Sequence, residues 1–247
     1  MKRQLLLILL LFSPLLQADE VRYYDVELII FEHLQAGARN SEQWPEKLNR
    51  EMPERLVEIG GPWPGERPEA YLPALSFTPL PVSQWRLTAE AEKIENSASR
   101  RLLAHQAWVQ PGLPQEEAIS VHFNQRILPP QTPVPDTGET TENMQTPALD
   151  SGTLDVLIRV SLARYLRVET DLLFTLDEPP VQESMMQMDA KAENETETRP
   201  APHYFHVQQL RRRIRSTELH YLDHPVLGML IMFTPHEVED KAAVKKK

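Results

Sequence analysis

The chain has 247 residues, with 36 acidic and 26 basic side chains and no cysteine. Without cysteine it can form no disulfide, thiol nucleophile, thiolate metal site or lipid-modified cysteine. The acidic balance argues against nucleic acid and anionic membrane surfaces as bulk partners, because long-range repulsion opposes their encounter. The length suits one domain or at most two, and the 41% hydrophobic fraction can fill one sizeable core.

Residues 1–18 have the pattern of a secretory signal peptide. Lys2 and Arg3 precede an apolar run over residues 5–16, and Ala18 supplies a small residue at the expected cleavage point. A helix of about twelve residues covers roughly 18 Å, which is too little for a hydrocarbon core of about 30 Å. We therefore expect export to the periplasm and no membrane insertion after cleavage; an uncleaved anchor is the alternative.

The first ordered block, residues 23–33, alternates with period two and carries apolar residues on both faces, which predicts a buried strand. Residues 34–81 are rich in proline and tryptophan, so we expect a surface loop with a short helix over residues 46–59. Trp44 and Trp63 could stack on a sugar, but aromatic residues beside prolines more often anchor a loop to the core.

A helix is expected over residues 88–102, with Thr88 as its N-cap and Arg100 and Arg101 in its last turn. Its apolar positions recur at intervals of three and four: Leu87, Ala91, Ile94, Ala98 and Leu102. Strands over residues 103–109 and 119–123 should follow as a hairpin.

Residues 153–174 keep one apolar phase for too long to be a single strand, so we expect a bend at residues 163–165 and two strands. Two segments rich in proline and acidic residues, 128–152 and 177–202, are expected to be disordered inserts, and residues 237–247 a flexible tail.

The last ordered block carries the candidate binding residues. Strands are expected over residues 204–214, 217–222 and 226–233. In a regular strand Arg211, Arg213 and Arg215 would share one face and Arg212 the other, giving a row of guanidinium groups that could bind carboxylates. The alternative is that these arginines pair with Glu116, Glu117, Glu169 or Asp171 on neighbouring strands. The candidate site residues are Arg211, Arg212, Arg213, Arg215, His220, Tyr221, Asp223 and His224.

No motif of a catalytic or nucleotide-binding site is present. The chain has no Gly-x-Ser-x-Gly elbow, no Ser-x-x-Lys signature and no phosphate-binding glycine loop. No local pattern selects a pair of carboxylates for glycan cleavage. His220, Asp223 and His224 have residue types that could ligate zinc, but a turn in which Asp223 caps the backbone is the simpler interpretation. We expect no cofactor, no metal and no enzymatic activity.

Residues 211–225 contain the pattern Arg-Arg-x-Arg-Ser-x-Glu-Leu-His-Tyr-x-Asp-His-Pro. This pattern, with residues 24–32, 103–108 and 152–174, resembles the CsiV family. The resemblance implies a periplasmic protein that binds peptidoglycan and supports a bifunctional penicillin-binding protein through its outer-membrane lipoprotein activator. It assigns no role to any individual residue.

Together these patterns predict one α+β domain over residues 19–236. We expect a single antiparallel or mixed sheet of roughly six to eight strands with one main helix packed on a face. The leading functional hypothesis is a non-catalytic, peptidoglycan-binding accessory protein. The alternatives are an envelope protein-interaction module without affinity for glycan, and a wall hydrolase.

Overall fold

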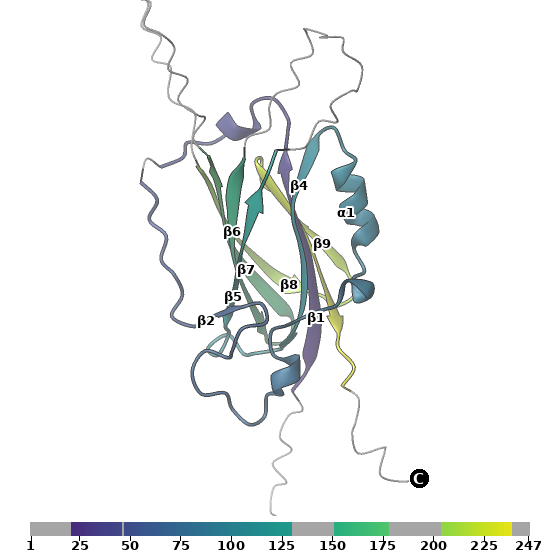
Figure 1. Ribbon diagram of the computed structural model, residues 1–247. Helices are drawn as coiled ribbons and strands as arrows, with labels where there is room; N and C mark the ends of the chain where they lie inside the picture. The colour runs from purple at the N-terminus through teal and green to yellow at the C-terminus, as the bar shows by residue number, and fades with distance from the viewer. Residues whose placement is uncertain (1–20, 46, 130–150, 178–203, 239–247) are drawn as a thin grey trace, which may run out of the picture.

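The computed structural model describes residues 21–45, 47–129, 151–177 and 204–238, which form two five-stranded sheets packed face to face (Figure 1). Sheet A has the order β3 (Thr78–Pro79), β4 (Arg100–Pro111), β1 (Tyr23–His33), β10 (Leu227–Pro235), β9 (Leu219–Leu222). Sheet B has the order β2 (Leu56–Glu58), β5 (Ser120–Ile127), β6 (Gly152–Leu162), β7 (Leu166–Leu176), β8 (Tyr204–Ile214).

The predominance of strands with one α-helix among the described residues agrees with the expected fold class, but the expected single sheet is wrong. The two inner faces share one apolar core, which includes Leu28 of β1, Trp108 of β4 and Phe174 of β7. Alternation tells which residues of a strand face a core, and it does not tell which strands pair. The sequence pattern therefore left the division into two sheets undetermined.

The strands with the clearest periodicity lie where the sequence predicts them. β1 spans residues 23–33 and is buried along nearly its whole length, with Leu28 and Ile30 in the shared core and Ile29 and Phe31 on the opposite face. β6 and β7 pair antiparallel along their full length, so the bend expected at residues 163–165 is confirmed. Sheet B is mixed, because β2 runs parallel to β5.

The hairpin expected from the strands now identified as β4 and β5 is wrong, because they belong to different sheets. The segment between them carries Leu113, Ala118 and Ile119, all of which are buried. These apolar side chains hold the connection against the core while the chain passes from sheet A to sheet B.

Helix α1 (Thr88–Glu95) is shorter than expected and covers the outer face of sheet A, on the side away from sheet B (Figure 1). Ala91 and Ile94 of α1 pack against Ile29 and Phe31 of β1. Arg100 and Arg101 belong to β4 instead of the last helical turn, because pairing with β1 takes this segment into the sheet.

Thr88 is the first helical residue and not the N-cap, so that expectation is also wrong. The Glu27 carboxylate instead accepts the backbone N–H groups of Arg86 and Leu87 at 2.7 and 2.8 Å, and His105 Nε2 lies 2.8 Å from it. Burial alone would raise the pKa of Glu27, but these hydrogen bonds outweigh burial and lower it.

The segment between β1 and α1 runs over the surface with three short 3-10 helices: η1 (Ala38–Asn40), η2 (Pro73–Leu75) and η3 (Val82–Gln84). The helix expected over residues 46–59 is wrong, because β2 pairs with β5 there. Trp44 packs edge-on against Phe205 and Trp63 stacks on Tyr71, both beside the core. This confirms the interpretation that the tryptophans anchor the loop.

Several expectations concern residues outside the described ranges. The signal peptide at residues 1–18, nearly all of both inserts at 128–152 and 177–202, and most of the tail at 237–247 lie there. Within the described ranges, no helix has the length and apolar character needed to cross a membrane.

Candidate functional site

The outer face of sheet B carries polar side chains in cross-strand rows. β6 and β7 turn their even-numbered apolar residues toward the core, so their odd-numbered residues face outward. The register aligns Ser120, Arg159, Glu169 and Leu210 in one row. The next row contains His122, Leu157, Asp171 and Gln208. Polar groups from four strands are thus brought side by side.

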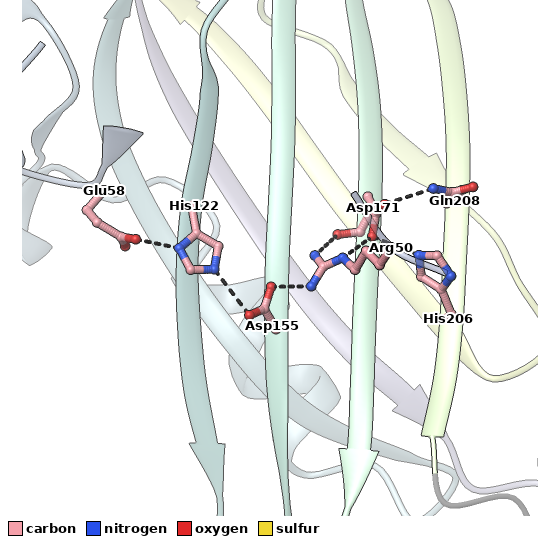
Figure 2. A network of polar contacts seen from close by, with 7 residues as sticks. All are labelled: Arg50, Glu58, His122, Asp155, Asp171, His206 and Gln208. Carbon is pink, nitrogen blue, oxygen red and sulfur yellow. Dashed lines mark hydrogen bonds and ion pairs between the residues drawn. The ribbon is translucent and has the colours of Figure 1, made fainter. Parts of the chain in front are cut away.

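Arg50 crosses this face from the loop before β2 (Figure 2). Its side chain is only 7% exposed, its Nη1 lies 2.6 Å from Asp155 Oδ1, and its Nε lies 2.7 Å from Asp171 Oδ1. Its Nη2 also donates to the backbone oxygen of Asp171 at 3.1 Å. One guanidinium group therefore joins β6, β7 and the loop.

The network continues on both sides of Arg50 (Figure 2). His122 contacts Glu58 through Nδ1 and lies 3.2 Å from Asp155 through Nε2. Burial alone would lower the pKa of His122, but the bonds to the two carboxylates raise it overall. At the other end, Asp171 lies 2.9 Å from His206 Nε2 and accepts from the Gln208 amide at 2.8 Å.

A hollow of about 490 Å³ lies beside this network, a volume in the range that holds small ligands. Within it Glu169 lies between Arg159 and Arg167, with ion-pair distances of 3.3 and 3.0 Å. We call it the sheet B hollow. It is lined by Glu51, Pro53, Ser120, Leu157, Arg159, Arg167, Glu169, Thr170, Asp171, Gln208, Gln209 and Leu210.

Sequence reasoning did not find this hollow. Arg159 and Arg167 are outward-facing charges in strands whose inward residues are apolar, and that contrast was the available signal. No sequence signal pointed to Arg50, because its partners Asp155 and Asp171 lie 105 and 121 residues away in the chain.

The expected row of Arg211, Arg213 and Arg215 is not formed, because a β-bulge interrupts the alternation. Val168 pairs with Arg211 and Leu166 with Ile214, so Arg212 and Arg213 together oppose the single residue Arg167. Arg213 has a left-handed backbone with φ of 62°. Arg215 lies beyond the end of β8 and pairs with Glu218 at 3.5 Å.

Arg211, Arg212 and Arg213 are exposed, and within the described part of the chain their side chains form no hydrogen bond or ion pair. Of the carboxylates considered as their cross-strand partners, Glu169 pairs with Arg159 and Arg167, and Asp171 pairs with Arg50. We call residues 211–213 the arginine segment. It continues β8 directly from Leu210, which lines the sheet B hollow, and its binding role stays a prediction.

His220 and His224 have separate partners near the edge of sheet A. His220 Nε2 lies 3.1 Å from the backbone oxygen of Arg215, and His224 Nε2 lies 3.2 Å from Glu42 Oε1. Across the described ranges, no group of three or more histidine or acidic side chains is placed to hold a metal ion.

Tyr221 and Asp223 contact each other through the phenol, which donates to the carboxylate, and the Tyr221 ring stacks on Phe31 at 6.2 Å. Burial and the contact with Asp223 raise the pKa of Tyr221 to about 12. The eight predicted residues therefore form an exposed arginine segment and a separate group of side chains bonded to one another or to neighbours.

Comparison with known proteins identifies a family. A family model described as "Peptidoglycan-binding protein, CsiV" matches residues 3–236, while no curated protein and no solved structure matches the chain. The match covers nearly the whole chain, including every described strand and α1. It confirms the resemblance carried by residues 211–225, and the chain belongs to the CsiV family of peptidoglycan-binding proteins.

Proposed function

We propose that this protein is a non-catalytic periplasmic accessory protein that binds peptidoglycan through the sheet B hollow and the adjoining arginine segment. The observation that carries the proposal is the hollow of about 490 Å³ on the one outer sheet face that α1 does not cover. Its arginines match the carboxylates of peptidoglycan stem peptides, which guanidinium groups bind in bidentate fashion. The family description supports the ligand.

The contacts of the acidic groups in the hollow favour binding over glycan cleavage. A glycoside hydrolase needs one carboxyl group that donates a proton and a second that acts as base or nucleophile. Asp171 instead receives hydrogen bonds from Arg50 and Gln208, and Glu169 pairs with two arginines. The family description names binding and no reaction.

We also propose where the protein acts and with which proteins. Lys2, Arg3 and the apolar run over residues 5–16 support export. The CsiV resemblance supports a role beside a bifunctional penicillin-binding protein and its outer-membrane lipoprotein activator. Cell fractionation followed by co-purification with these two proteins tests this part, and retention of the full-length chain in the cytosol contradicts it.

Co-sedimentation with purified sacculi tests the proposed ligand and surface. We expect binding that weakens with salt, since charged groups make the contacts. Arg159→Gln with Arg167→Gln should weaken binding about tenfold or more, and Arg211→Glu with Arg212→Glu and Arg213→Glu should weaken it by less. Arg164→Gln is the matched control, because Arg164 is exposed on the turn between β6 and β7 and lies over Tyr165.

Failure of the wild-type chain to sediment with sacculi would exclude peptidoglycan binding and leave the interaction-module alternative. Full binding by the Arg159 and Arg167 double variant would remove the hollow from the proposal. Release of soluble muropeptides from sacculi would identify a hydrolase instead.

A further inference from the structure

We infer that the sheet B hollow recognises the charged stem peptide of peptidoglycan and not its glycan strand; this rests on the proposed function and specifies its ligand. The lining has two cations, Arg159 and Arg167. It also has three acidic groups, Glu51, Glu169 and Asp171, of which Asp171 pairs with Arg50. None of the described residues that line the hollow is aromatic. Sites for sugars commonly use an aromatic face, whereas a surface with both charges fits a zwitterion.

The tryptophans, which would be the natural sugar platforms, are occupied elsewhere. Trp108 is fully buried, Trp44 packs against Phe205, and Trp63 stacks on Tyr71. Trp85 lies 4.4 Å from the His105 ring on the sheet A side. Each of these rings is therefore held in packing.

The two well-exposed tyrosines also have ring contacts. Tyr221 stacks on Phe31 at the edge of sheet A, and the Arg164 guanidinium lies over the Tyr165 ring. Among the described residues, the exposed aromatic rings lie outside the hollow lining, so the hollow itself offers polar contacts.

The arrangement around Glu169 allows an exchange of ion pairs on binding. Glu169 is about one-third exposed and is shared by Arg159 and Arg167, so an incoming carboxylate can take one arginine while Glu169 keeps the other. Arg167 also has unused donor capacity, because its Nε is buried without a hydrogen-bond partner among the described residues. A rotated Arg167 could use that donor on the ligand.

A stem peptide supplies the complementary groups. It has free carboxylates for Arg159 and Arg167 and, on its diamino acid, an ammonium group that Glu51 or Glu169 can accept. Gln208 donates through its side-chain nitrogen to Asp171, so its side-chain oxygen remains to accept from a peptide N–H group. A glycan strand offers hydroxyl and acetamido groups and leaves the charges of the hollow without partners.

Competition with the wild-type protein bound to sacculi tests the inference without any risk from misfolded variants. Two competitors are compared at equal concentration: the free stem tetrapeptide, and bare glycan strands. An amidase removes the stem peptides from these strands, and the muramic acid carboxylates that it exposes are then converted to amides, so that the strands carry no charge. We expect the tetrapeptide to displace the protein and the bare strands to have no effect. Acetylation of the diamino acid's side-chain amine should weaken competition about tenfold.

Variants identify the residues that bind the peptide. Arg167→Gln should weaken tetrapeptide binding about tenfold in calorimetry, while Arg164→Gln should leave it unchanged. Unfolding curves are measured to check that both variants fold. If Arg167→Gln does not fold, Arg167→Lys replaces it in the binding measurement.

The outcomes separate the inference from the proposed function. Displacement by bare glycan strands but not by tetrapeptide overturns the inference and leaves peptidoglycan binding intact. Absence of wild-type co-sedimentation overturns the proposed function itself. Equal displacement by an unrelated acidic peptide of the same charge also overturns the inference, because the hollow would then recognise anions in general.

Discussion

The outer faces of the two sheets are closed in different ways. On sheet A, Ile94 of α1 packs on Ile29 and Phe31, so the cover is apolar. On sheet B, the crossing loop is held by Arg50 through two carboxylates, and a polar hollow remains beside it. An apolar cover gains stability from burial, whereas a polar face retains charges that a ligand can use. We therefore expect the cover of sheet A to contribute mainly stability, and we propose that the outer face of sheet B contributes recognition.

The largest expected effect comes from removing the apolar cover. Ile94→Ala should lower the free energy of unfolding by about 2–4 kcal/mol, because Ile94 is buried against β1 and its loss leaves a cavity. Urea denaturation measures the change. Val82→Ala is the matched control, since Val82 is exposed and should change stability by less than about 0.5 kcal/mol.

Sacculus binding by the folded fraction of Ile94→Ala should equal that of the wild type. A selective loss of binding in this variant would show that the sheet A face also contributes to recognition, and would break the division between the faces.

A smaller effect is expected from Arg50→Met, which leaves Asp155 and Asp171 without their cation. Both carboxylates are partly exposed, and Asp171 keeps Gln208, so the free energy of unfolding should fall by about 1–3 kcal/mol. Arg55→Met is the matched control, because among the described residues the Arg55 guanidinium donates to the backbone oxygen of Glu117 and to no carboxylate.

Unlike Ile94→Ala, Arg50→Met should also weaken sacculus binding, because its loop carries Glu51 and Pro53 of the hollow lining. Unchanged stability together with unchanged binding would mean that the Arg50 network does not hold the loop.

The smallest effect is a pH dependence of opposite sign on the two faces. The raised pKa of His122 means that its stabilisation is complete below the unfolded value of about 6.5 and is lost as the pH rises through the folded pKa. The lowered pKa of Glu27 means that its stabilisation is present above about 4.3 and is lost as the pH falls through the folded pKa. A rise in pH should therefore weaken the sheet B face through His122, and a fall in pH should weaken the sheet A face through Glu27.

Unfolding free energies measured from about pH 3 to 9 test this pair of slopes. His122→Gln should flatten the curve on the alkaline side only, and Glu27→Gln on the acid side only. A His122→Gln curve parallel to the wild type above pH 6.5 would contradict the role of His122.

The sequence predicted those parts of the fold that depend only on the alternation of apolar and polar residues within a single strand. β1 and the turn between β6 and β7 follow from alternation that continues over many residues. The division into two sheets and the short α1 depend on which strands pair, and local periodicity does not contain that information.

The candidate site was predictable only in part. The Arg211–Arg215 cluster marked the end of β8, but the bulge at Arg212 and Arg213 depends on how β8 pairs with β7. The Arg50 network needed the loop before β2 to lie over β6 and β7, which follows from tertiary packing. Long-range ion pairs of this kind become visible only once the strand register is known.

The two long connections of sheet B join strand ends that already lie side by side, so their lengths can vary. β5 and β6 pair at Ile127 and Gly152, and β7 and β8 pair at Thr175 and Tyr204, so both long connections leave from the same end of the sheet. The hollow lies toward the opposite end, beside Ser120 and Arg159. Adjacent paired ends can be joined by a turn of about two to five residues. Either connection could therefore be trimmed or extended, by evolution or by design, while the residues that line the hollow keep their register.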